Sequence, residues 1–228
     1  MKIKSTAVYL AALVAVFLAG AGVGRITAHR ETAAWTPPGV PASESALFSG
    51  IPDVRQSTNY TCGAAALQAV LAYWGTSERE DRLVARLHCT PELGTHPDDI
   101  VRVAREFGLR AELREGLKLD DLEAALSKGV TVIVDLQAWR QSQNRPWTEI
   151  WDDGHYMVLL GMDRKNLYFE DPSLLGSRGY IPRQEFLERW HDYEGLPPLK
   201  VTDRAYVHMA IFIQGDRPVP QPALEQVK

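Results

Sequence analysis

The order of the hydrophobic patterns along the chain most constrains what it can fold into. Apolar residues recur at helical spacing in the early segments 62–74, 78–87, 97–107 and 119–127. After these the apolar runs become short and rich in β-branched and aromatic residues, in segments 130–136, 155–162, 166–171 and 205–213. Residues 163–165 between two of those segments predict a hairpin. We therefore expect an α+β fold, with an N-terminal helical half followed by an antiparallel β-sheet half.

The length of 228 residues is enough for one domain of ordinary size and some additional segments. We expect a folded domain over residues 49–215, preceded by a proline-containing tether at 26–48 and followed by a loose tail at 216–228. The net charge is −4, and Lys and Arg are scattered rather than clustered. This pattern predicts no nucleic-acid partner.

The first 25 residues predict a signal peptide or a single membrane anchor. Lys2 and Lys4 precede an uncharged stretch at 7–24, which as a helix would be about 27 Å long, close to the thickness of the hydrocarbon core. The small residues at 19–22 would permit cleavage, whereas Arg25 could equally end an anchor. Either alternative predicts export to the periplasm or another extracytoplasmic space, with a membrane contact if the segment stays uncleaved.

Cys62 stands at the beginning of the first predicted helix, with Thr61 as its N-cap and Gly75 as its stop. Unpaired backbone N–H groups at a helix N-terminus lower the pKa of a thiol, which suits a nucleophile. The other cysteine is Cys89, and an oxidising compartment would allow the two to form a structural disulfide instead. The sequence leaves both alternatives open, a reactive Cys62 beside a buried Cys89 thiol or a disulfide.

A thiol nucleophile needs a base, an orienting group for that base and a donor to the oxyanion. His155 opens one predicted strand and Asp171 closes the next, so a hairpin would make them neighbours. Gln56, just ahead of the helix, could supply an amide donor. Asp152 and Asp153 are alternatives to Asp171 as the orienting carboxylate.

These residues lie in three blocks, "RQSTNYTCGAAALQAVLAYWG", "GHYMVLLGMD" and "LYFEDPSLLG". The blocks resemble the signature segments of the bacteriocin-processing, double-glycine-leader cysteine peptidases, a papain-like family. The resemblance spans about residues 51–213. It implies a papain-like fold and a peptidase with Cys62 as nucleophile, His155 as general base, Asp171 as its orienting group and Gln56 as oxyanion donor.

The chain also departs from that family. An acidic residue commonly precedes the cysteine there, and here it is Thr61. The sequence has no G-x-x-x-x-G-K-[ST] loop, so transport is not expected and leader processing is not implied. The expected substrate is a peptide or protein, with Gly-Gly sites implied only by the resemblance, and a monomer is favoured. A catalytically silent peptide-binding module, or a transferase or deamidase using the same thiol, remain alternatives.

Other conspicuous residues have plainer interpretations. Trp139, Trp147 and Trp151 precede His155 and either line a substrate cleft or pack in the core. No cofactor or metal is expected, because no second ligand pair accompanies the adjacent His88 and Cys89. The remaining histidines are interpreted as a core or sheet residue in the middle of a strand, two surface residues and a tether residue: His208, His96 with His191, and His29.

Overall fold

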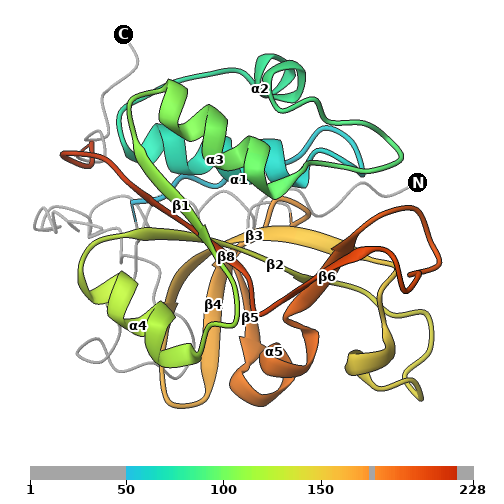
Figure 1. Ribbon diagram of the computed structural model, residues 1–228. Helices are drawn as coiled ribbons and strands as arrows, with labels where there is room; N and C mark the ends of the chain where they lie inside the picture. The colour runs from blue at the N-terminus through green and yellow to red at the C-terminus, as the bar shows by residue number, and fades with distance from the viewer. Residues whose placement is uncertain (1–49, 175–177, 220–228) are drawn as a thin grey trace, which may run out of the picture. The chain divides into compact units, whose positions relative to one another are not determined.

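The computed structural model describes residues 50–174 and 178–219 (Figure 1). The segment predicted at 1–25 and the tether at 26–48 lie outside these residues, as does the tail from residue 220. All four predicted helices are present, as α1 Cys62–Tyr73, α2 Glu80–Arg86, α3 Pro97–Glu106 and α4 Leu119–Ser127. Among the described residues, no helix combines the length and the apolar run that crossing a membrane requires.

Glycine ends α1 as the sequence predicts, because Gly75 has a φ of +91° and its N–H donates to Ala72 O. The other end differs from the prediction. Thr61 precedes the helix, but its side chain makes no cap and its Oγ1 instead pairs with Thr58. The Thr61 carbonyl accepts from Ala65 N, and no side chain caps the first turn at Cys62.

The main sheet has six strands in the order β1-β8-β2-β3-β4-β5, and every neighbouring pair is antiparallel. Its strands are β1 Arg110–Arg114, β2 Thr131–Gln137, β3 Gly154–Met162, β4 Asn166–Glu170, β5 Gly179–Pro182 and β8 Ala210–Gln214. The predicted hairpin is confirmed between β3 and β4, where Asp163 Oδ1 accepts from Lys165 N and Asn166 N. A separate ribbon pairs β6 His191–Glu194 with β7 Arg204–Val207.

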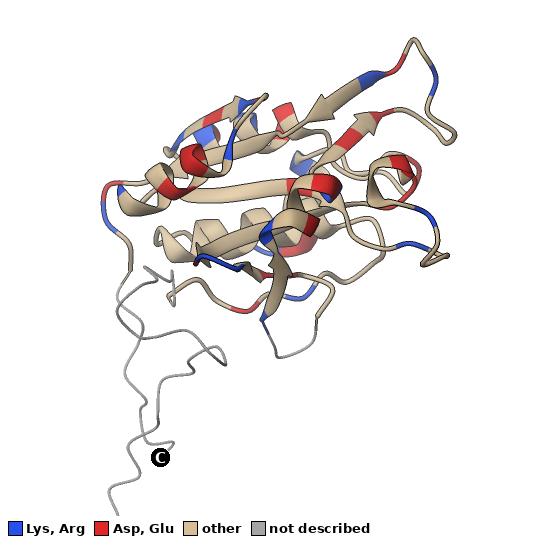
Figure 2. Cartoon of the chain, turned by 90° about the horizontal axis from the view of Figure 1, so that it is seen from below, with Lys and Arg blue, Asp and Glu red and all other residues tan. Residues whose placement is uncertain are grey.

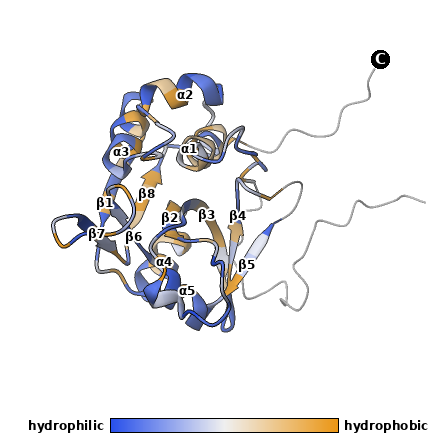
Figure 3. Cartoon of the chain, turned by 90° about the vertical axis from the view of Figure 1, so that its right-hand side faces the viewer, coloured by the Kyte–Doolittle hydropathy of each residue, from blue (hydrophilic) through white to orange (hydrophobic). Residues whose placement is uncertain are grey.

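The central strands are buried on both faces. Every residue of β2 is buried, and so is every residue of β3 after Gly154. The helices supply the cover: α1 and α3 lie on one side of the sheet and α4 and α5 (Arg183–Arg189) on the other, around the apolar strands (Figure 3). Charged residues lie on many of the outer elements (Figure 2). This arrangement fixes α1 against β3, which is the contact on which the site depends.

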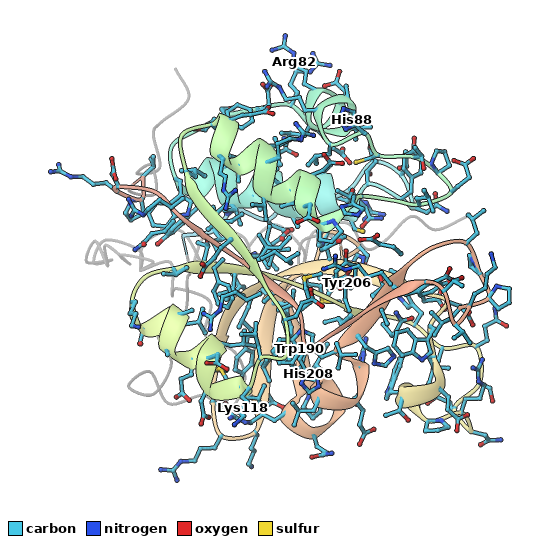
Figure 4. All side chains as sticks on the ribbon, in the orientation of Figure 1. Arg82, His88, Lys118, Trp190, Tyr206 and His208 are labelled. Carbon is cyan, nitrogen blue, oxygen red and sulfur yellow. The ribbon has the colours of Figure 1, made fainter. Side chains whose placement is uncertain are left out.

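One predicted strand is wrong in extent. The segment 205–213 is broken at His208, whose φ of +52° interrupts the ladder, so that β7 joins β6 while β8 enters the main sheet. His208 is therefore half-buried between strands rather than in the middle of one, with its N–H donating to Trp190 O and its ring stacked on Trp190 (Figure 4). The strand β1, the ribbon strand β6 and the helix α5 were not predicted, because they are short and largely polar.

Candidate active site

The thiol of Cys62 lies at the N-terminus of α1, buried at 8% exposure. Burial raises the pKa of this thiol, but a hydrogen bond with His155, the charge of His155 and the backbone N–H groups of Tyr156 and Gly63 outweigh that effect. The pKa of Cys62 is therefore lowered from its ordinary value. A buried thiol held this way is poised to ionise as a nucleophile.

The hairpin β3–β4 brings His155 and Asp171 together. Nε2 of His155 lies 2.7 Å from Oδ1 of Asp171, and both side chains are buried. The same oxygen accepts from the N–H and the hydroxyl of Ser173, each at 2.8 Å. Because Nε2 is occupied by Asp171, Nδ1 is the ring nitrogen left for the thiol.

The charges of Cys62, His155 and Asp171 stabilise one another. Burial lowers the pKa of His155, but hydrogen bonds and charges from Asp171 and Cys62 raise it overall to about 9. Burial likewise raises the pKa of Asp171, yet its bonds to His155 and Ser173 lower it overall. A thiolate, an imidazolium and a carboxylate in sequence are the charge states that these shifts favour.

The alternative carboxylates do not reach the imidazole. The backbone N–H of Asp153 donates to Gln137 Oε1, and Asp152 lies 3.9 Å from Arg145. Of the three aspartates considered as the orienting group, Asp171 is thus the one bonded to His155.

Gln56 lies at the same end of the site but its amide points elsewhere. Its backbone N–H donates to Pro172 O, directly after Asp171, at 3.0 Å. Its side-chain Nε2 donates to Thr58 O at 2.7 Å, and its Oε1 is buried and has no hydrogen-bond partner among the described residues. The structure therefore places Gln56 beside the end of the β3–β4 hairpin that carries Asp171, with the amide nitrogen bonded within its own loop.

A cavity of about 550 Å³ opens at Cys62. One wall is the loop from His88 to Pro97 between α2 and α3, and the other is the β6–β7 ribbon with Trp151. Tyr206 of that ribbon also lines the cavity. A peptide laid in this cavity would pass the thiol.

Thr95 of the loop wall packs against the helix turn that carries Cys62. A Cβ on Gly63 would lie 2.7 Å from Thr95 Cβ, so the glycine permits this close approach. The Thr95 carbonyl accepts from Tyr156 OH at 3.1 Å, and its Oγ1 lies 3.0 Å from Cys89 Sγ. The residue was not singled out in the sequence, where a lone threonine in a loop gives no signal.

Of the three tryptophans that precede His155, two lie at the site and one packs in the core. Trp151 lines the cavity, and the ring of Trp139 lies 4.9 Å from that of His155, where it shields the imidazole. Trp147 is instead buried beneath Arg189 and belongs to the core packing.

The other histidines are mostly as expected. His96 is exposed and its Nε2 lies 2.6 Å from Glu194, across the cavity. His191 is not a surface residue: it is buried, and its Nε2 lies 2.7 Å from Ile150 O. His29 lies outside the described residues. In the described part of the chain, no three His, Cys, Asp or Glu side chains are grouped so as to hold a metal ion.

Both cysteines are free thiols in the structure, so the disulfide alternative is not the state described. Cys89 is half-buried, as the thiol alternative predicts, and burial raises its pKa. The two thiols thus differ in the direction of their shifts, with Cys62 the more acidic.

Sequence reasoning missed two carboxylates at the cavity, the buried Asp135 on β2 and the half-buried Asp192 on β6. Asp135 did leave a signal, because it interrupts an otherwise apolar strand pattern, "VTVIVDL". Asp192 left none, since its neighbours in sequence are polar and aromatic.

Comparisons with known proteins show which family and fold this chain resembles. A protein of Methanothermobacter thermautotrophicus, itself uncharacterised, is 34% identical over 121 residues, which are 53% of this chain and 71% of that protein. A C39-like peptidase from Bacillus anthracis superposes with a TM-score of 0.58 at 16% identity, covering 76% of this chain and 99% of that one. A double glycine motif protease from an AMS/PCAT transporter, solved in complex with the leader peptide, gives 0.51 at 20% identity, covering 76% and 96%.

The solved structures establish the fold, which is the α+β fold of C39 peptidase domains, and thereby confirm the expected papain-like architecture. Family membership rests on the sequence itself. The model of the Peptidase_C39 like family matches residues 48–197, well over half of the chain and including Gln56, Cys62, His155 and Asp171. The chain therefore belongs to the peptidase C39-like family, whose members act as cysteine peptidases or are peptidase-like.

Proposed function

We propose that this protein is a cysteine peptidase that hydrolyses peptide bonds through Cys62, His155 and Asp171. The observation that carries the proposal is that three side chains interact in sequence. The Cys62 thiol has a pKa lowered by His155, and the imidazole of His155 lies 2.7 Å from Asp171. Burying three ionisable groups costs folding free energy, so such a set contributes little to stability. Groups of this kind cluster at functional sites.

In the first half of the reaction the Cys62 thiolate attacks the carbonyl carbon of the scissile bond. His155, protonated at Nδ1, gives that proton to the leaving nitrogen as the C–N bond breaks. An acyl-enzyme and an amine result. Asp171 keeps the ring oriented and stabilises the imidazolium at the start of this step.

In the second half, His155 removes a proton from water, and the hydroxide forms a bond to the acyl carbon. The C–S bond breaks, the thiol leaves as thiolate, and the carboxylic acid product departs while the imidazole is again an imidazolium. The buried position of His155 beneath Trp139 limits exchange of this proton with bulk water.

The oxyanion would be held by the Cys62 backbone N–H and the Gln56 side chain. The uncapped first turn of α1 supports the first donor. The second requires the Gln56 amide to leave Thr58 O and turn towards the thiol. Its buried, unpartnered Oε1 means that the present orientation leaves a cost which a turn of the amide could relieve.

A peptide substrate is supported by the cavity at Cys62 and by the leader peptide bound to one solved relative. A Gly-Gly site is part of this proposal only through that relative, which is a double glycine motif protease. We further propose that the chain is exported, with its N-terminal segment as a signal peptide or a membrane anchor, supported by the uncharged run at 7–24 after Lys2 and Lys4. An alkaline phosphatase fusion after residue 48 should be active if the segment exports the chain, and an inactive fusion would contradict export.

The test of activity uses a peptide library with the purified protein in its reduced state. Wild type should release new peptide termini, detected by mass spectrometry. Cys62→Ala should release none, and the matched control Cys89→Ala should retain cleavage. Because both thiols are free in the structure, a stoichiometric Cys62–Cys89 disulfide in protein purified without reductant would contradict an active resting state.

Other outcomes separate the alternatives. Peptide binding without cleavage, equal for wild type and Cys62→Ala, would identify a peptidase-like binding module. Loss of an amide nitrogen from a side chain, or transfer of the acyl group to an added amine, would assign the thiol to deamidation or acyl transfer instead.

A further inference from the structure

The cavity beside Cys62 is acidic. Five carboxylate residues line it and no Lys or Arg does, among the described residues: Glu92, Asp135, Asp152, Asp192 and Glu194. The cationic side chains that could enter it are the two histidines His88 and His96, and His96 already contacts Glu194. The mechanism proposed above uses none of these acids, so their gathering needs a separate explanation.

Asp135 is the member that a folded chain has least reason to bury. It lies in the middle of β2, opposite Tyr156, and only 4% of it is exposed. Its Oδ1 is buried and has no hydrogen-bond donor in the described structure. The hydroxyl of Tyr156 donates to Thr95 O at 3.1 Å. A carboxylate placed like this is costly unless something compensates for it.

The neighbouring carboxyl belongs to Asp192 on β6. Its Oδ1 accepts from Gln137 Nε2 at 3.0 Å, which holds the side chain in place. The absence of a side chain at Gly154 also matters, because a Cβ there would lie 2.0 Å from Asp192 Oδ2. The carboxylate of Asp192 thus occupies the space left by Gly154, the residue that precedes His155 in the sequence.

The two carboxyls share their charge. Burial, together with the charge of Asp192, raises the pKa of Asp135 well above its ordinary range. Burial raises the pKa of Asp192 to about 6, despite bonds from Tyr193 N–H, Asp135 and Gln137. At neutral pH the pair therefore holds one proton and one negative charge, and that charge faces the cavity without a cationic partner.

We infer that Asp135 and Asp192 form a subsite for a primary ammonium group of the substrate, next to the thiol. An ammonium offers three N–H donors and one positive charge, which match the unpartnered Oδ1 of Asp135 and the single charge of the pair. The group is either the free N-terminus of a short peptide or the side chain of a lysine. This inference rests on the proposed function, because it assigns a substrate feature to the same cavity.

The test measures alkylation of Cys62 by two pairs of peptidyl chloromethyl ketones that differ in one ammonium group. The first pair is Gly-Gly with a free or an acetylated N-terminus, and the second is acetyl-Lys-Gly against acetyl-norleucine-Gly. In wild type the charged member of one pair should alkylate Cys62 about tenfold faster or more, as expected for hydrogen bonds to a charged group. The pair that shows the gain identifies the source of the ammonium.

Variants then locate the effect. Asp192→Asn removes the charge of the pair, because Asp135 keeps its proton at neutral pH, and it should reduce the charged-to-neutral rate ratio to near one. Asp135→Ala removes the unpartnered acceptor oxygen and should lower the ratio as well, which covers the case in which the first variant does not fold. Asp152→Asn, which removes an acid at the cavity whose side chain is 53% exposed, should leave the ratio as in wild type.

Equal rates within both pairs in wild type, or a ratio that Asp192→Asn leaves unchanged while Asp152→Asn lowers it, would overturn the inference. Uncharged iodoacetamide tests the proposed function separately. If it alkylates Cys62 no faster than Cys89, the thiolate is not activated, whereas the charged-to-neutral ratio at Cys62 still reports on the subsite.

Discussion

Asp171→Asn isolates the charge of the orienting residue from its hydrogen bonds. Oδ1 of Asp171 accepts from His155 Nε2 and from two groups of Ser173. An asparagine can place its own Oδ1 in the same position and accept the same hydrogens, so it loses the negative charge while the geometry is kept.

The magnitude follows from the difference between charged and neutral hydrogen bonds. A bond to a charged group contributes about 1.5–3 kcal/mol and a neutral one about 0.5–1.5, so the substitution costs the imidazolium about 1–1.5 kcal/mol. One pKa unit corresponds to about 1.4 kcal/mol. The pKa of His155, now about 9, should therefore fall by about one unit. Because that imidazolium stabilises the thiolate, the pKa of Cys62 should rise.

The assay is the rate of iodoacetamide alkylation at Cys62 against pH, read by mass spectrometry so that Cys89 is followed separately. The midpoint of the profile should move towards higher pH in Asp171→Asn and further in Asp171→Ala, which removes the acceptor altogether. Asp163→Asn is the matched control, since Asp163 accepts from two backbone N–H groups at the far end of the same hairpin. Unchanged midpoints in both Asp171 variants would refute the reasoning that Asp171 acts on the thiol through the imidazole.

Three further predictions address other parts of the site. Gly63→Ala should lower the free energy of unfolding by about 1–3 kcal/mol in urea titrations, because its Cβ would lie 2.7 Å from Thr95 Cβ; an unchanged value would mean that the loop yields freely. Burial raises the pKa of Glu170 to about 8, so the folded state keeps a proton that the unfolded chain loses from about pH 4.5 upwards, and stability contributed by this group falls across that window. Glu170→Gln, which can still accept from Val54 N, should match wild type near pH 4 and exceed it by a few kcal/mol at pH 8, and a constant difference across this range would contradict the shift. Gln56→Ala should reduce peptide turnover about 10²–10³-fold and leave the iodoacetamide rate unchanged, whereas equal turnover would remove the side chain from the oxyanion site.

The sequence was sufficient for the elements whose pattern is long or strongly apolar. The helix from Cys62 and the hairpin that joins His155 to Asp171 follow from periodicity and a short turn, and the packing of α1 against β3 then brings the thiol to the other two groups. Local chemistry was less informative at the ends of elements. Thr61 is a good N-cap residue, yet its hydroxyl pairs with Thr58, because a tight loop before the helix offered a nearer partner.

The rest depended on contacts between distant segments. The break at His208 arises from bonds to Trp190 and Leu117, which lie 18 and 91 residues away and leave no mark in the local pattern. The Asp135–Asp192 pair is of the same kind, since its two strands belong to different sheets. Spacing also predicted that Gln56 would lie near the thiol, but the direction of its amide depends on a two-residue loop contact that spacing does not determine.

The bond from Gln56 N–H to Pro172 O ties the segment before the nucleophile to the strand that carries the orienting carboxylate. A second hydrogen bond joins the same two segments, from Val54 N–H to the side chain of Glu170. Neither amide can exchange its hydrogen with solvent while these contacts hold. The rate of deuterium uptake at residues 54 and 56 would therefore report how often this segment separates from the strand end that carries Asp171. The measurement does not require a known substrate.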